Sequence, residues 1–324
     1  MTPFLDQRAL SAHKLQNTLH SALLLGGLGA ILALSFVLLM GWHGLGWAAI
    51  LVGVMLVLVP RIPPEALMRA YRARAIDAEH GGQLGALVGL IADRAALATP
   101  PILYVIPSLT LNAFAVGQPG HAVIGITEGL LRRLTMREIA GVLGHEMSHI
   151  RNNDLAVMGI ADVLTRLTQA MSYVAVALAA MNVVAALYGE QHVSWFAVAA
   201  LYLAPTCASL LQLGLSRTRE YDADLEAAHI TGDPLGLASA LRRLERYTGR
   251  FWEDLMLPVP GRRIPYPSLL RSHPTTDERV ERLVALSGQP MLPPIVVSEQ
   301  PLITLAGFGP GEMRPRYRFP GFWF

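Results

Sequence analysis

The chain has 324 residues, of which 52% are hydrophobic and only 15% charged, and its mean hydropathy is +0.40. Since a soluble domain carries roughly 25% charged residues, this composition indicates a membrane protein. The net charge of +2 is too small to indicate a nucleic-acid-binding protein. The single cysteine, Cys207, excludes a disulfide framework within the chain, and we expect it to be a small buried apolar residue.

Two apolar runs lie near the N-terminus, at residues 19–40 and 42–59, with a very short turn between them. A run of about 20 apolar residues is long enough to cross the ~30 Å hydrocarbon core of a bilayer. No small-residue cleavage site follows the first run, which is too long for the core of a signal peptide, so we expect it to be retained. The two runs predict a transmembrane hairpin that ends at Pro60.

The segment after this hairpin is polar and changes character along its length. Residues 65–99 have the apolar spacing of an amphipathic helix. Strand character follows at residues 102–106, 111–116 and 122–126, and the Gly- and Pro-containing residues 117–120 supply a turn between the last two. A helix followed by a small β-sheet is therefore predicted.

The sequence HEMSH at residues 145–149 lies on a well-delimited predicted helix. Residues 135–138 form a capping-box pattern that starts it, and an apolar periodicity continues to a break at residues 152–154. Histidines four residues apart share a helix face and can bind one Zn²⁺, while Glu146 beside them can take a proton from a water that the metal activates. The alternative is two ordinary polar positions on an amphipathic helix, which this context disfavours.

Two further apolar runs, residues 167–187 and 194–215, flank a short loop without lysine or arginine. They predict a second transmembrane hairpin, because each has about 20 apolar-dominated residues, more than a soluble core helix needs. The basic residues near the runs gather on the opposite side: Arg8, Lys14, Arg61, Arg69, Arg72, Arg74, Arg151, Arg166, Arg217 and Arg219. By the positive-inside rule, both termini and all large polar segments are predicted to be cytoplasmic.

A catalytic zinc site needs a third protein ligand and one open position. The metzincin arrangement is excluded, because Leu155 occupies the place of its third histidine. Glu220 and Asp224, four residues apart after the fourth run, are better candidates: Glu220 for the metal, and Asp224 for the other ring nitrogen of a ligating histidine. The alternative is a solvated charge run, and the spacing alone does not decide between them.

Helices are also predicted at residues 216–230, 234–248 and 276–286, and residues 288–324 form a Pro- and Gly-rich tail. We expect this tail to be loosely ordered. Its arginines and terminal aromatic residues also allow a second hypothesis, anchoring at the membrane surface.

Several motifs together resemble those of the HtpX family of gluzincin-type membrane peptidases, relatives of the CAAX prenyl endopeptidases. These motifs are HEMSH, EYDAD at 220–224, NAFAVG at 112–117, GLL at 129–131, and SHP at 272–274 with Arg279. The order of apolar runs, zinc helix and glutamate also matches. The likeness covers roughly residues 15–287, and it departs in the tail and in having Pro-Thr after His273, where a second proline is common.

The resemblance implies a fold that is mainly α with a small β-sheet, an α+β zincin-like catalytic domain plus four transmembrane helices. Its parts would be residues 1–61 with the first hairpin, 62–154 with the zinc helix, 155–215 with the second hairpin, 216–287 with the glutamate ligand, and the tail 288–324.

The resemblance also implies one Zn²⁺ per chain, held by His145, His149 and Glu220, with Glu146 as catalytic base. Asp224 would support a ligand from behind. The implied contacts to substrate or transition state are His273 and Arg279, near the open metal position, and Asn112, on an edge strand that receives the substrate backbone. A simpler interpretation of His273 and Arg279 is a turn and a helix start.

The expected function is a membrane-embedded zinc endopeptidase that cuts cytoplasmic regions of membrane proteins, in quality control or a stress response. Its partners would be misfolded membrane proteins and the lipid bilayer. A CAAX-type processing endopeptidase stays open. An intramembrane protease is disfavoured by the charged residues that flank the zinc helix, and a scaffold with structural zinc is disfavoured by Glu146 and the open metal position.

Overall fold

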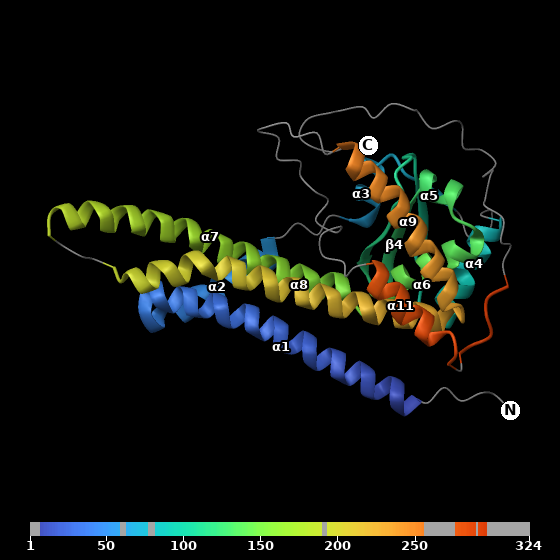
Figure 1. Ribbon diagram of the computed structural model, residues 1–324, viewed down its shortest axis with the longest axis horizontal. Helices are drawn as coiled ribbons and strands as arrows, with labels where there is room; N and C mark the ends of the chain where they lie inside the picture. Colours follow the sequence, from blue (N-terminus) through green and yellow to red (C-terminus); the bar gives the residue numbers. More distant parts are fainter. Residues whose placement is uncertain are drawn as a thin grey trace. The chain divides into compact units, whose positions relative to one another are not determined.

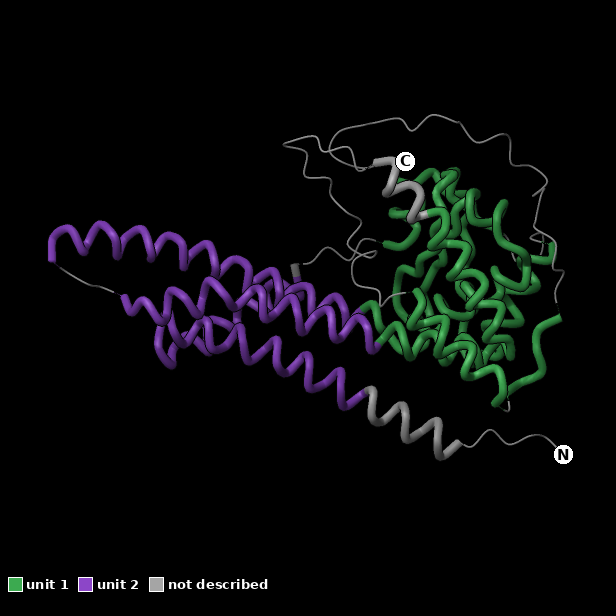
Figure 2. Tube along the Cα trace, in the orientation of Figure 1, with its two compact units in different colours: residues 1–7, 62–155, 219–324 green, residues 8–61, 156–218 purple. Residues whose placement is uncertain are grey.

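The computed structural model of the chain describes residues 7–58, 63–76, 82–189, 193–255, 276–289 and 291–296. The chain divides into two compact units, each assembled from segments that are distant in the sequence (Figure 2). The first unit contains residues 1–7, 62–155 and 219–324, and the second contains residues 8–61 and 156–218.

Long apolar helices build the second unit. They are α1 (Gln7–Met40), the short 3-10 helix η1 (Gly41–His43), α2 (Gly44–Leu58), and most of α7 (Asp154–Leu187) and α8 (Trp195–Thr231) (Figure 1). Among the described residues, three stretches are long and apolar enough to cross a membrane: Thr18–Val57, Asp154–Leu187 and Trp195–Thr231. The first of these has 40 residues and contains both runs of the predicted first hairpin, on either side of η1.

Two sequence expectations in this unit differ from the structure. Cys207 is exposed on α8 rather than buried, because the described residues do not cover its side of the helix. The fourth run and the predicted helix 216–230 are one continuous helix, α8, which passes through Pro205 and Gly214 without a break.

A four-stranded sheet forms the centre of the first unit, in the order β1 (Arg74–Ile76), β2 (Ile102–Ile106), β4 (His121–Thr127), β3 (Ala113–Gln118). Strands β2 and β4 are parallel and the other pairs are antiparallel. The three predicted strands are confirmed, with β3 starting two residues later than expected. Within the described residues β3 pairs only with β4, so it is an edge strand.

The predicted helix over residues 65–99 is wrong as a single element. The chain forms α3 (Pro64–Ala70), then β1, then α4 (Gly82–Arg94). Arg72 has a left-handed backbone with φ of 53°, which ends the helical path of α3. The amphipathic spacing belongs to α4 alone, where Leu84, Leu87 and Ile91 are buried.

Among the described residues, the first unit also contains the end of α8 and the helices α5 (Glu128–Arg133), α6 (Met136–Arg151), α9 (Pro234–Leu255) and α11 (Thr276–Leu286). The predicted capping box is present at the start of α6, with Thr135 and Glu138 each bonding the backbone N–H of the other. The central core joins the sheet to α4 and α6 through the side chains of Leu87, Ile91, Val105, Ile124, Ile126, Ile139, Leu143 and Met147.

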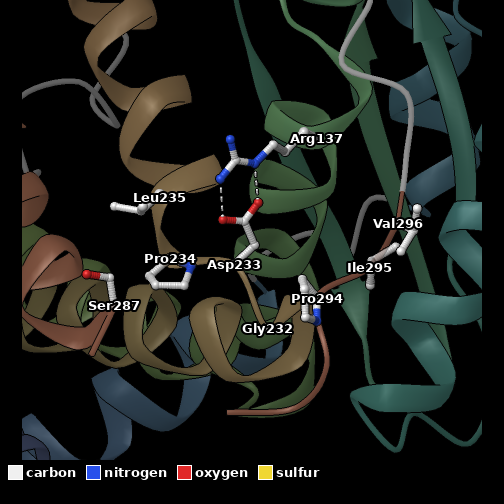
Figure 3. Close-up of a pocket in the computed structure, with 9 residues that line it drawn as sticks. All are labelled: Arg137, Gly232, Asp233, Pro234, Leu235, Ser287, Pro294, Ile295 and Val296. Atoms are coloured by element: carbon white, nitrogen blue, oxygen red, sulfur yellow. Dashed lines mark hydrogen bonds and ion pairs between the residues drawn. The ribbon is translucent and has the colours of Figure 1, made fainter. Parts of the chain in front are cut away.

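The beginning of the C-terminal tail packs on the first unit. The N–H of Ile295 donates to the Thr231 carbonyl at 3.0 Å, and Arg94 Nη1 donates to the Pro293 carbonyl at 2.9 Å. This segment borders a cavity of about 390 Å³ (Figure 3). The residues that line the cavity are Arg137, Gly232, Asp233, Pro234, Leu235, Ser287, Pro294, Ile295 and Val296. None of them belongs to the predicted metal site, and the tail beyond residue 296 lies outside the described residues.

An ion pair beside this cavity joins α6 to the start of α9. Arg137 donates to both carboxylate oxygens of Asp233, at 2.5 and 2.8 Å, and Asp233 also accepts the N–H of Gly236 at 3.0 Å. Burial of Asp233 opposes its charge, but these donors outweigh it and lower the pKa of its carboxyl from the ordinary value of 3.8.

This ion pair predicts a pH-dependent contribution to stability. A carboxyl with a lowered pKa stabilises the folded state above its unfolded pKa, and the stabilisation disappears as the pH falls through the folded pKa. Asp233→Asn keeps a helix-capping oxygen but loses the charge. We therefore expect a lower unfolding midpoint for the variant at pH 7, and a difference from wild type that shrinks towards zero below pH 3.8. A difference that is equal at both pH values would contradict this account.

Candidate metal centre

Three side chains from two helices of the first unit converge on one point. His145 and His149 come from α6 and Glu220 comes from α8. The distance between the two Nε2 atoms is 3.1 Å, His145 Nε2 lies 3.4 Å from Glu220 Oε2, and His149 Nε2 lies 3.7 Å from Glu220 Oε1. Tetrahedral ligands at the usual zinc distances are about 3.3 Å apart. The three sides of this triangle therefore suit a tetrahedral metal ion.

Close helix packing brings Glu220 to the histidines. A Cβ at Gly144 of α6 would lie 3.5 Å from the Cα of Ala227 on α8, and one at Gly141 would lie only 2.8 Å from the Cα of Leu237 on α9. Larger side chains at these positions would push the helices apart. Small residues on the buried side of α6 thus set how closely the glutamate approaches the metal-binding face.

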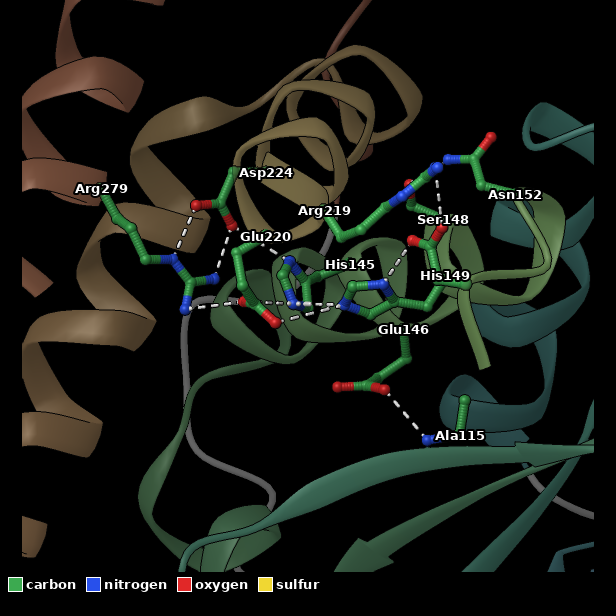
Figure 4. A network of polar contacts seen from close by, with 11 residues as sticks. Ala115, His145, Glu146, Ser148, His149, Asn152, Arg219, Glu220, Asp224 and Arg279 are labelled. Carbon is green, nitrogen blue, oxygen red and sulfur yellow. Dashed lines mark hydrogen bonds and ion pairs between the residues drawn. The ribbon is translucent and has the colours of Figure 1, made fainter. Parts of the chain in front are cut away.

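A carboxylate lies against the other ring nitrogen of each histidine (Figure 4). His149 Nδ1 lies 2.8 Å from Oδ2 of Asp154, the first residue of α7. His145 Nδ1 lies 3.0 Å from Oδ1 of Asp224, at ion-pair distance although not aligned as a hydrogen bond. Carboxylates here favour the tautomer with hydrogen on Nδ1 and direct each Nε2 lone pair to the shared point.

Each of these carboxylates is in turn held by an arginine. Arg279 of α11 donates to both oxygens of Asp224, at 2.6 and 2.7 Å, and its Nη1 lies 3.2 Å from Glu220 Oε2. Arg219 of α8 donates to Oδ1 of Asp154 at 3.1 Å. All four side chains are almost completely removed from solvent. The histidines are therefore oriented by a buried network.

The electrostatics of the site favour a cation. Burial opposes charge on His145, but the carboxylates of Asp224 and Glu220 outweigh it and raise the pKa of the ring to about 10. These carboxylates thus attract positive charge to Nε2, where a divalent cation would replace the proton. The donor set of two imidazoles and one carboxylate, with an open fourth direction, is typical of catalytic zinc.

Glu146 lies beside the histidines and faces the sheet. Its Oε2 accepts the backbone N–H of Ala115 on the edge strand β3 at 3.0 Å. Burial raises the pKa of its carboxyl above the ordinary value, against the opposing effect of the two histidines. A raised pKa suits a carboxylate that takes up a proton near neutral pH.

Two of the three predicted substrate contacts, Asn112 and Arg279, lie among the described residues. Asn112 is exposed directly before β3, and its backbone N–H donates to Thr127 Oγ1 at 3.0 Å. The buried guanidinium of Arg279 is bound to Asp224 and Glu220, so the structure brings it to the ligands rather than to open space. His273 lies outside the described residues.

Sequence reasoning missed several polar residues around the site. Asp154 and Arg219 were not predicted to act there, although Asp154 ends the NND break five residues after His149. A second missed group is Glu226, which accepts from Ser148 Oγ at 2.8 Å and from Asn152 Nδ2 at 2.9 Å, and so joins α8 to the end of α6. The contacts of Arg219 and Glu226 join residues more than 60 positions apart, so no local pattern marks them. The short separation of Asp154 from His149 is the one local signal that could have been used.

Comparison with known proteins gives consistent matches. The sequence profile of Peptidase family M48 matches residues 78–287. A protein named Protease HtpX homolog from Acaryochloris marina is 36% identical over 300 residues, which cover 84% of this chain and 96% of that protein. Another of that name from Kineococcus radiotolerans is 36% identical over 299 residues, covering 85% and 99%. The crystal structure of S. mikatae Ste24p aligns with a TM-score of 0.47 and 20% identity, covering 84% of this chain and 66% of that one.

The matches to HtpX homologues over most of the chain confirm the resemblance derived from its motifs. Together with the apolar helices, they identify an integral membrane protein with a protease domain. The group of His145, His149 and Glu220 could hold the metal cofactor that this family of peptidases implies. The chain therefore belongs to Peptidase family M48.

Proposed function

We propose that this protein is a zinc-dependent endopeptidase of the membrane. The observation that carries the proposal is the triangle of His145, His149 and Glu220, with sides of 3.1 to 3.7 Å and the carboxyl of Glu146 beside it. When bound there, Zn²⁺ would supply Lewis acidity, which acidifies water and polarises a carbonyl.

The residues of the chain supply the proton transfer and the orientation. Glu146 would take a proton from the attacking water and deliver it to the leaving amine, and its raised pKa suits both steps. Asp154 and Asp224 keep the two rings directed to the metal, and Arg279 holds Asp224 and Glu220 in place. The network fixes this arrangement before substrate binds, which lowers the cost of reorganisation in the reaction.

The unpaired edge of strand β3 is an argument for a peptide substrate. An extended peptide can pair with the unpaired edge of a sheet through main-chain hydrogen bonds, which give affinity without strong side-chain selectivity. The N–H of Ala115 already points from β3 to Glu146, so a peptide paired there would pass the catalytic carboxylate. Asn112 directly precedes this strand and would contact the bound chain.

The expected membrane arrangement is four spans with both termini and the active site in the cytoplasm of a bacterium. Support comes from the distribution of basic residues and from the two runs within Thr18–Val57. Glu220 follows the apolar part of α8 by five residues, about 7.5 Å along a helix. Substrates would then be the cytoplasmic regions of membrane proteins, and misfolded ones would be preferred in a quality-control or stress role.

Loss of a metal ligand tests the zinc site. We expect Glu220→Ala and His149→Ala to purify without zinc and without proteolytic activity, because each removes one of the three ligands. Zinc content by mass spectrometry and cleavage of an unfolded protein are the measurements. Asp222→Ala, two residues from Glu220 on the same helix, is the control and should keep one zinc per chain. Stoichiometric zinc in Glu220→Ala would overturn the assignment of this ligand.

The preference for misfolded substrates has its own test. One membrane protein would be offered in its folded form and as a destabilised variant with the same cytoplasmic sequence. Faster cleavage of the destabilised form is expected, since an edge strand can pair only with an extended chain. Equal rates would contradict a quality-control role and leave the peptidase assignment intact.

A further inference from the structure

The two carboxylate oxygens of Asp154 contact two different side chains, His149 and Arg219. Oδ2 of Asp154 lies 2.8 Å from His149 Nδ1, and Oδ1 of Asp154 accepts from Arg219 Nη1 at 3.1 Å. The carboxylate is thereby fixed between the imidazole ring and the guanidinium. The side chains of Asp154 and Arg219 are only 4% and 13% exposed, so this pair is shielded from screening by solvent.

The two residues also come from different helices. Asp154 is the first residue of α7, whereas Arg219 directly precedes the ligand Glu220 in α8. Helix α8 thus provides the ligand Glu220 and also Arg219, which binds the carboxylate that contacts His149. A shift of α7 or α8 at this point would change the direction of the His149 lone pair.

From these contacts we infer that Asp154 and Arg219 are a positioning pair for His149, which sets the affinity and geometry of the metal ion. The inference rests on the proposed zinc peptidase function. A simpler role for Asp154 is to stabilise the N-terminus of α7 as an acidic residue. That role explains neither the direction of its carboxylate towards His149 nor the buried arginine on its other oxygen.

The double variant Asp154→Asn/Arg219→Gln separates the two roles. It leaves no unpaired buried charge, and asparagine keeps the size and a hydrogen-bonding oxygen of aspartate at the N-terminus of α7, losing only its charge. The control is Asp162→Asn, which alters an exposed aspartate of α7 that also pairs with an arginine, Arg166, at 2.7 Å. Both proteins and the wild type would be measured at full length in detergent.

We expect the double variant to bind zinc about 10- to 100-fold more weakly than the control, as measured by competition with a chelator. Its cobalt-substituted form should show altered visible absorption, while its metal-free unfolding midpoint stays close to that of the control. Each single variant should weaken zinc binding in the same direction, and the two effects should not add.

Zinc affinity within twofold of the control together with an unchanged cobalt spectrum would overturn the inference. A lower metal-free midpoint with unchanged zinc affinity would assign the pair a structural role only, and so would also overturn it. Failure of the wild type itself to bind zinc would instead sink the proposed function. The wild-type and control measurements therefore tell these two failures apart.

Discussion

Glu146→Gln is expected to retain one zinc ion and to lose about three orders of magnitude of peptidase activity. Glutamine fills the same space but cannot take a proton from water, and general acid–base catalysis contributes about 10²–10⁴-fold in enzymes. The amide oxygen of the variant can still accept the Ala115 N–H, but it carries no negative charge. The measurement is the rate of cleavage of an unfolded protein, with zinc content determined on the same preparation.

The matched control is Glu245→Gln, the same substitution at an exposed position of α9. This variant should cleave at the wild-type rate. Proteolysis by Glu146→Gln at more than about a tenth of the wild-type rate would remove Glu146 from the role of base. Loss of zinc from the variant would leave the role undecided for that preparation, so cleavage would then be repeated on Glu146→Gln reconstituted with excess zinc.

Arg279→Gln should destabilise the metal-free protein strongly. The guanidinium is the shared partner of two buried carboxylates, Asp224 and Glu220. Burial alone would lower the pKa of Arg279, but the two carboxylates have the larger effect and raise it, so the positive charge is favoured there. Removing one partner of a buried ion pair costs about 3–5 kcal/mol, since it leaves uncompensated charge. The unfolding midpoint of metal-free protein, compared with that of wild type, measures the effect.

Arg282→Gln is the control on the same helix. Arg282 is 58% exposed and lies over the ring of Tyr221, with 3.7 Å between its guanidinium carbon and the ring centroid. Such an exposed contact is worth about 0.5–1 kcal/mol, so the control should unfold close to wild type. A stable Arg279→Gln with normal zinc binding but a raised KM would instead support the substrate contact that the sequence motif implied.

The parts of the site that the sequence predicts are those set by local spacing. HEMSH and its capping box specify one helix, and four-residue spacing alone brings His145 and His149 to one face. The pairing of Glu220 with these histidines needs the fold, because α8 approaches α6 through tertiary packing that includes the close contact at Gly144. The motif resemblance supplied that pairing, whereas spacing alone left a solvated charge run open.

What the sequence does not predict depends on backbone conformation or on distant contacts. The helix expected over residues 65–99 fails at Arg72, whose left-handed conformation no propensity indicates. The contacts of Arg279 with the carboxylates of Asp224 and Glu220 arise from tertiary packing, which no local pattern indicates, and its contact with substrate stays a prediction. The contact of Asp154 with His149 depends on where α7 begins. The contact of Arg219 with the same carboxylate depends on the packing of α7 against α8 at these residues.

X-ray absorption at the zinc edge of the purified full-length protein tests the central claim most directly. The account predicts one zinc per chain with two imidazole nitrogens and carboxylate or water oxygen at about 2.0–2.1 Å. No sulfur neighbour is expected, because the single cysteine, Cys207, lies on the apolar part of α8. The zinc signal itself should disappear in His149→Ala, because this variant loses one of the three ligands and is expected to purify without zinc. A spectrum with sulfur at about 2.3 Å, or an unchanged spectrum in that variant, would contradict the account.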